Sequence, residues 1–176
     1  MFFKIFSFEL KYWVRNPLFY IYIGSLFIIS TLAMASATGL FESVTVTRSS
    51  IAYLNSAFSL NSFINGFSVI GFFLIPSIVG GTIVKDYTSN TSNVLYSYPF
   101  TKANYLFAKY LSGLFITILV LLSIALGAMA GAYLPGTNPE LLGPFKIFNY
   151  IQPYLIYLIP NLIFFSAVVF AVVTFS

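Results

Sequence analysis

The sequence predicts an all-α fold, a polytopic transmembrane helical bundle with an N-terminal interfacial elbow helix. Of its 176 residues, 59% are hydrophobic and only 7% are charged, whereas a soluble domain carries about a quarter of its residues as charged side chains. The apolar residues form long continuous runs, each sufficient for the roughly 20-residue helix that crosses a bilayer. A membrane β-barrel would instead show short alternating segments of about ten residues. These observations favour helices surrounded by lipid.

Four apolar runs form the transmembrane domain, which we place at residues 17–176. The spans are expected at 17–40, 60–84, 105–133 and 148–174. No basic residue follows the fourth run at Thr174, so the sequence leaves open a continuation of the polypeptide beyond residue 176. A cleaved signal peptide is the alternative for the first run, but that run approaches a full span and follows a long segment that contains an acidic residue.

Basic residues near the spans predict the orientation in the membrane. Six of them flank the spans on one side: Lys4, Lys11, Arg15, Lys85, Lys102 and Lys109. Only Arg48 and Lys146 lie on the other side. Because Lys and Arg are retained in the cytoplasm, we expect a multi-pass protein of the bacterial inner (plasma) membrane with a cytoplasmic N-terminus.

Residues 1–16 predict an amphipathic elbow helix. Lys4, Ser7, Lys11 and Arg15 are spaced by three, four and four residues, which places them on one helical stripe. The remaining positions are mostly aromatic or aliphatic, as in helices that lie in a membrane interface. Pro17 then favours a break followed by the first turn of the next helix.

Glu9 departs from this pattern, because it projects about 140° from the polar stripe and falls among apolar residues. A carboxylate facing lipid is unfavourable. Two interpretations stay open: Glu9 lies near the lipid headgroups, or it faces protein and pairs with a basic residue of the bundle or of a partner subunit.

The chain contains neither histidine nor cysteine. It therefore lacks the residues of Ser-His and Cys-His catalysis and of Cys/His zinc sites. We expect no catalytic, cofactor-binding or metal site in this chain, and hence no enzyme. The basic residues are too dispersed for a nucleic-acid-binding patch.

The polar connection between the second and third spans, about residues 85–104, predicts a structured cytoplasmic segment. Thr88, Ser89 and Asn90 are suitable helix N-caps, and Pro99 would end a short helix after Leu95. A short helix with an apolar end can dock into a groove on a soluble partner.

In this region the sequence resembles the permease subunits of ABC-2-type transporters, also called type V ABC exporters. The resemblance covers about residues 5–125. It includes the elbow, the first two spans and an ordered series of residues: Asp86, Asn90-Thr91, Leu95, Pro99, Thr101-Lys102 and Lys109. Asn90 stands where the family usually has glycine.

The resemblance implies a coupling helix that rests on a cytoplasmic ABC ATPase subunit, with a second permease copy or paralogue completing the transporter. The residues expected to couple are Asp86, Asn90, Thr91, Leu95, Tyr98, Pro99 and Lys102; those expected to shape the elbow are Glu9, Lys11, Arg15 and Pro17. No G-x-x-x-x-G-K-[ST] loop occurs in the chain. ATP and magnesium would therefore be bound by the partner ATPase.

Within the spans, Gly127 and Gly131 form a G-x-x-x-G pattern that favours close helix packing. Pro76 and Pro160 are expected to kink their helices. Asn61 and Asn65 are polar, and either interhelical hydrogen bonding or a substrate path would explain them.

Two functions other than an ATP-driven exporter stay open. A membrane anchor or scaffold of a larger complex would tolerate scrambling of residues 86–102. An ion-coupled carrier would stay active after ATP depletion, although carboxylates deep within the spans, which proton relays often use, are not evident.

Overall fold

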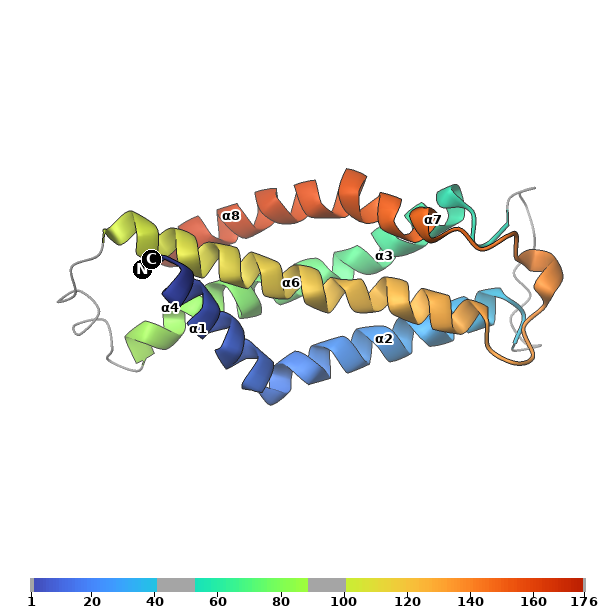
Figure 1. The fold of residues 1–176 in the computed structure, drawn as a ribbon, viewed down its shortest axis with the longest axis horizontal. Coiled ribbons are helices and arrows are strands. Elements are labelled where there is room, and N and C mark those ends of the chain that lie inside the picture. The colour runs from blue at the N-terminus through green and yellow to red at the C-terminus, as the bar shows by residue number, and fades with distance from the viewer. Residues whose placement is uncertain (1, 41–52, 89–100, 176) are drawn as a thin grey trace. The chain divides into compact units, whose positions relative to one another are not determined.

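A computed structural model describes residues 2–40, 53–88 and 101–175. All regular elements within these ranges are helices (Figure 1), which confirms the all-α prediction. The α-helices are α1 (Phe2–Arg15), α2 (Pro17–Ala37), α3 (Ala57–Ile75), α4 (Gly81–Thr88), α6 (Lys102–Ala132), α7 (Ile147–Pro153) and α8 (Ile159–Phe175). Two π-helical turns, Pro76–Gly80 and Tyr154–Leu158, and one 3₁₀ turn, Pro139–Leu141, complete the regular structure of these ranges.

Among the described residues, four helices are long and apolar enough to cross a membrane. They are Pro17–Ala37, Ala57–Lys85, Lys102–Ala132 and Ile147–Phe175. Their bounds lie within a few residues of the four predicted spans, so the four-span bundle follows from the apolar runs.

The second and fourth of these helices change from α to π geometry along their length. Pro76 begins the π-helical turn after α3, and Pro153 directly precedes the turn after α7. Proline removes a backbone donor and crowds the preceding turn, so a local change of helical pitch follows. In the fourth helix this change precedes Pro160, the residue at which the sequence predicted a kink.

The chain divides into two compact units. The first unit comprises Met1–Tyr20, Ile70–Leu119 and Asn161–Ser176; the second comprises Ile21–Val69 and Val120–Pro160. The first unit thus contains α1, α4, the N-terminal part of α6 and most of α8.

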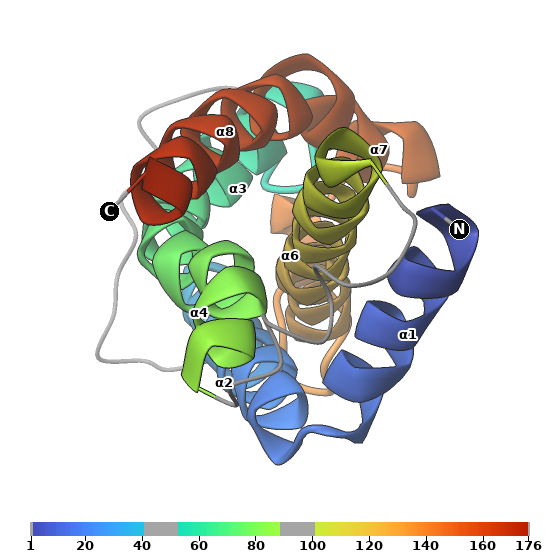
Figure 2. The same cartoon turned by 90° about the vertical axis from the view of Figure 1, so that its left-hand side faces the viewer.

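In the first unit, α6 packs closely against the segment that leads into α4. A Cβ atom at Gly113 would lie 3.1 Å from the Cα atom of Val79, a contact that no larger residue allows without displacement of the backbone. On the other side of α6, the Tyr110 hydroxyl donates a hydrogen bond to the carbonyl oxygen of Ile163 in α8, at 3.0 Å. Figure 2 shows α1 beside the same part of α6, where the rings of Phe6 and Phe115 lie 6.2 Å apart.

In the second unit, α2, α3, α6 and α7 share a buried core. It consists of Met34, Leu60, Ala128, Ala132 and Tyr150. The two alanines of α6 are small side chains, which lets the backbone of α6 approach its neighbours in this core closely.

Candidate functional site

The helix α1 presents two chemically distinct faces. The side chains of the predicted polar stripe, Lys4, Ser7, Lys11 and Arg15, are all exposed. On the opposite face, Glu9 and Trp13 are 2% and 5% exposed. One face of α1 is therefore available to water or headgroups, while the other packs against protein.

Glu9 forms a buried ion pair with Lys109. Its Oε1 atom lies 3.0 Å from Lys109 Nζ, and Lys109 is also only 2% exposed. Glu9 therefore faces protein and pairs with a basic residue of the bundle, the second of the two interpretations that the sequence left open. If one partner is removed, the other charge stays buried without a counter-charge. A single substitution at either residue is therefore expected to lower the stability of the folded protein.

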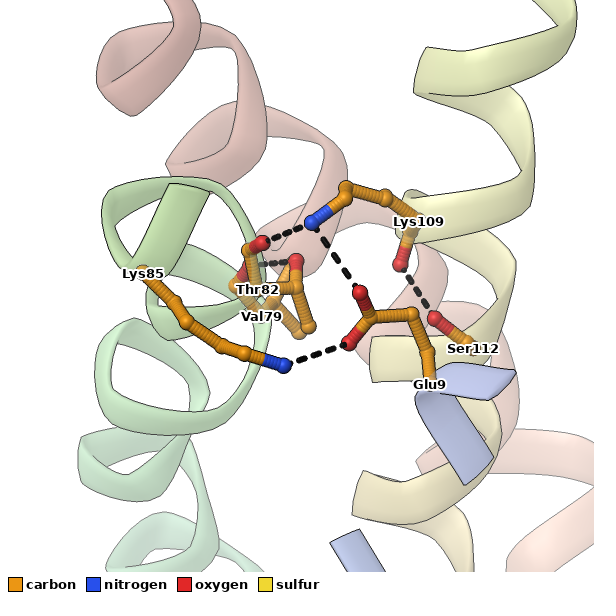
Figure 3. Close-up of polar contacts among 6 residues, drawn as sticks. All are labelled: Glu9, Val79, Thr82, Lys85, Lys109 and Ser112. Atoms are coloured by element: carbon orange, nitrogen blue, oxygen red, sulfur yellow. Dashed lines mark hydrogen bonds and ion pairs between the residues drawn. The ribbon is translucent and has the colours of Figure 1, made fainter. Parts of the chain in front are cut away.

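Lys85 extends this ion pair to α4 (Figure 3). Its Nζ atom lies 3.9 Å from Glu9 Oε2 and 3.2 Å from the centroid of the Tyr12 ring. A cation over an aromatic face is stabilised by the ring quadrupole. Lys85 thus contacts α1 through both a carboxylate and an aromatic ring.

Lys109 also links α6 directly to α4. Its ammonium group donates a hydrogen bond to the carbonyl oxygen of Thr82, and its own carbonyl oxygen accepts one from Ser112 Oγ at 2.8 Å. Thr82 Oγ1 in turn donates to the carbonyl oxygen of Val79 at 2.7 Å (Figure 3). We call Glu9, Lys85, Lys109 and Thr82 the ion-pair cluster; it joins α1, α4 and α6.

Three members of the ion-pair cluster, Thr82, Lys85 and Lys109, lie on the two helices that lead into and out of the predicted coupling segment. The helix α4 ends at Thr88 and α6 begins at Lys102. Asp86 lies in α4, where only its backbone is described, and Lys102 is an exposed residue at the start of α6. The other predicted coupling residues, Asn90, Thr91, Leu95, Tyr98 and Pro99, lie outside the described residues.

The elbow between α1 and α2 is formed by Asn16 and Pro17. Asn16 Oδ1 accepts a hydrogen bond from the backbone N–H of Leu18 at 3.0 Å, which satisfies one donor of the first turn of α2. Pro17 occupies the first helical position, where its missing N–H costs nothing. Lys11 and Arg15 lie on the last two turns of α1, next to this break.

The burial of Lys109 is a feature that sequence reasoning missed. The sequence placed Lys109 among the basic residues that flank the spans, whereas the structure buries it within α6. The displacement of Glu9 from the polar stripe of α1 was the one available signal, because a carboxylate on an apolar face requires a cationic partner.

The predicted packing glycines lie in the second unit, where α6 meets α2. A Cβ atom at Gly127 would overlap Ser30 Oγ and lie 2.6 Å from the carbonyl oxygen of Phe27. At Gly131 it would overlap the carbonyl oxygen of Thr31 and lie 2.9 Å from Met34 Cβ.

A polar clasp in the second unit was also missed. Asn55 Nδ2 donates to the carbonyl oxygen of Gly143 at 2.7 Å, and the Gly143 N–H donates to Asn55 Oδ1 at 2.8 Å. Asn149 Nδ2 donates to the backbone carbonyl oxygen of Asn55 at 3.0 Å. The side chain of Asn55 thus joins segments 88 residues apart in sequence.

The chemistry of the ion-pair cluster is that of helix attachment. Within residues 2–40, 53–88 and 101–175, no group of three His, Cys, Asp or Glu side chains could hold a metal ion. The cluster combines one carboxylate with two ammonium groups, and their contacts join three helix segments.

A protein-family model described as ABC-2 family transporter protein matches residues 4–176 of the chain. No curated protein and no solved structure matches the sequence or the fold.

Proposed function

Because the chain belongs to the ABC-2 family of transporter proteins, we propose that it couples ATP hydrolysis by a separate cytoplasmic ATPase to the export of a substrate. It is a multi-pass membrane permease of an ABC transporter, and the described part of the chain contains four membrane-compatible helices. The family implies a cytoplasmic ABC ATPase as partner. In our proposal that partner binds ATP and magnesium, and this chain contributes the path through the membrane.

The observation that carries this proposal is the attachment of α1 to both helices that border residues 89–101. A force applied to that segment acts on the ends of α4 and α6. In our proposal, the contacts of Lys109 with Glu9 and Thr82 transmit that force to α1. Such a connection suits a permease that must convert the closure of an ATPase into movement of its spans.

The orientation and assembly form part of the same proposal. With the N-terminus in the cytoplasm of a bacterial cell, the exposed basic residues of α1 and the start of α6 face the anionic leaflet and the ATPase. A second copy of the chain, or a paralogue, completes the transporter in this proposal, as the resemblance to ABC-2-type permeases implies.

The experiment is replacement of residues 89–100 by a Gly/Ser segment of the same length. The chain is purified with an affinity tag from its native membranes, and ATP-binding polypeptides that accompany it are detected with 8-azido-ATP. We expect an ATP-binding subunit and vanadate-sensitive ATP hydrolysis with the unaltered chain, and the loss of both with the replacement.

Residues 41–52 provide the matched control, because this equally long segment lies on the opposite side of the membrane in the proposed topology. Its replacement should leave the ATP-binding subunit bound. If the subunit is absent from the unaltered chain, or is retained after replacement of residues 89–100, the coupling role is wrong and a membrane anchor becomes the better explanation.

An ion-coupled carrier is the second candidate. Glu9 is a buried carboxylate, the residue type that proton relays use, but it lies in α1, outside the membrane-compatible helices of the described residues. The two functions respond differently to energy supply. In inverted vesicles, an ATP-driven exporter stops when ATP is removed while an imposed ion gradient persists, whereas a carrier continues.

A further inference from the structure

An open pocket of about 400 Å³ lies at the elbow of the first unit. It is lined by Phe8, Lys11, Tyr12, Arg15, Asn16 and Pro17. This volume is within the range of about 300 to 1,000 Å³ that is typical of small-molecule sites. Glu9 does not line the pocket, because it points from the opposite face of α1.

The pocket is positively charged. Lys11 and Arg15 lie one helical turn apart on the exposed stripe of α1. Among the residues that the structure describes, neither forms an ion pair with a carboxylate. Glu9, the one acidic residue of α1, is engaged by Lys109 and Lys85, so it does not neutralise the pocket.

Two aromatic rings form the wall of the pocket that faces α4. Lys85 Nζ lies 3.2 Å from the centroid of the Tyr12 ring and 5.4 Å from that of Phe8. A third cation therefore lies beside the rings that line the pocket. Aromatic side chains next to basic ones are typical of the level of the lipid headgroups.

The position of the pocket along the chain places it at the boundary between water and hydrocarbon. Pro17 lines the pocket and is also the first residue of the first membrane-compatible helix. Beyond it, Leu18 and Tyr20 are 45% and 58% exposed, which provides an apolar surface for acyl chains. A ligand here would have an anionic group at the pocket and a hydrocarbon part along α2.

We propose that this pocket binds the headgroup of an anionic phospholipid, with Lys11 and Arg15 contacting its phosphate. The guanidinium group of Arg15 suits two phosphate oxygens at once, and Lys11 adds a second positive charge. The assignment to the cytoplasmic leaflet rests on the orientation in the proposed function, but the site itself does not require an ATPase. A diffuse attraction to any anionic surface would instead involve every basic residue of α1 equally.

The test is a lipid titration of the purified full-length chain, followed by native mass spectrometry. Phosphatidylglycerol is compared with phosphatidylcholine, which has the same phosphate but no net charge. We expect one retained phosphatidylglycerol per chain, bound at least about fivefold more tightly than phosphatidylcholine, as expected for an added cation near a membrane surface. Lys11→Gln and Arg15→Gln should each remove this preference, and Arg15→Lys should retain part of it.

Lys4→Gln is the matched control, since Lys4 lies on the same exposed stripe but does not line the pocket. It should leave the preference unchanged. An equal loss with Lys4→Gln, or equal binding of the two lipids, would overturn the proposal. Inorganic phosphate distinguishes the source of the anion: if phosphate alone displaces the lipid at millimolar concentration, the site binds free phosphate and not a headgroup. These readouts are independent of ATP, so their failure is distinguishable from that of the transport proposal.

Discussion

Glu9 Oε1 lies 3.0 Å from Lys109 Nζ, and both side chains are almost completely buried. These residues are 100 positions apart along the chain, yet they join the elbow helix to the third membrane-compatible helix. The ammonium group of Lys109 also reaches the Thr82 carbonyl oxygen. Contacts of this ion pair therefore join three helix segments of the first unit.

Breaking this pair should destabilise the protein strongly. Glu9→Gln leaves the Lys109 ammonium buried without a counter-charge, and we expect a loss of about 3 to 5 kcal/mol in the free energy of unfolding. Lys109→Met leaves Glu9 with Lys85 alone. Because the two residues interact directly, the decrease in the free energy of unfolding of the double variant should be clearly smaller than the sum of the decreases in the two single variants.

The measurement is unfolding in lipid nanodiscs, followed by the fluorescence of Trp13, the chain's single tryptophan, which is buried on the same face of α1 as Glu9. Glu140→Gln is the control, because Glu140 is exposed. Additive losses in the double variant would show that the two residues are not energetically coupled.

Gly131 should not tolerate a methyl group. Gly131→Ala places a Cβ atom against the Thr31 carbonyl oxygen and Met34 Cβ, so α2 and α6 must separate. We expect a loss of about 1 to 3 kcal/mol, seen as a lower midpoint of thermal unfolding. Gly66→Ala is the matched control, since no atom lies within 4 Å of a Cβ atom at that position. Equal midpoints for the two variants would contradict the close packing of α2 and α6.

Asn55 should protect the backbone of Gly143. Asn55→Ala removes the donor and the acceptor that satisfy Gly143, at a cost of about 1 to 3 kcal/mol. Hydrogen–deuterium exchange at the Gly143 amide should become faster, while Asn161→Ala, at an exposed position in α8, should leave it unchanged. Unaltered exchange in Asn55→Ala would mean that the clasp does not form in solution.

The proposed topology predicts opposite labelling of two single-cysteine variants. The chain contains no native cysteine, so Asn104→Cys and Glu140→Cys each provide one thiol, and both positions are exposed. In intact cells, a membrane-impermeant maleimide should label Cys at 140 and not at 104; inverted vesicles should give the reverse. The same pattern in both preparations would refute the orientation.

The sequence was sufficient for the four spans, because continuous apolar runs depend only on local composition. The break at Asn16-Pro17 and the polar stripe of α1 were also predictable, since proline geometry and helical periodicity act over a few residues. The contacts within the ion-pair cluster were harder to predict from the sequence. Glu9 was recognised as misplaced on its helix, but nothing local indicates that Lys109 and Lys85 are its partners.

The hydrogen bonds of Asn55 also join distant parts of the chain, and local sequence did not predict them. Asn55 lies two residues before α3, in a sequence without any catalytic or metal-binding pattern, and its partner Gly143 is 88 residues away. Every residue has a backbone N–H or C=O group, so a hydrogen bond to the backbone does not require a particular residue type at the partner position. The packing of Gly113 on Val79 was missed for a related reason, since Gly113 belongs to no small-residue repeat of the G-x-x-x-G kind.

The most direct test of the ATP-coupled permease is site-specific cross-linking from the predicted coupling segment. Ser97→Cys carries a photoreactive benzophenone maleimide, and Glu140→Cys carries the same reagent as the control on the opposite side. After irradiation of native membranes, we expect Cys at 97 to yield a covalent adduct with an ATP-binding polypeptide, in an amount that changes when ATP and magnesium are added, and Cys at 140 to yield none. No adduct at 97, or equal adducts at both positions, would contradict the proposed coupling of this chain to an ATPase.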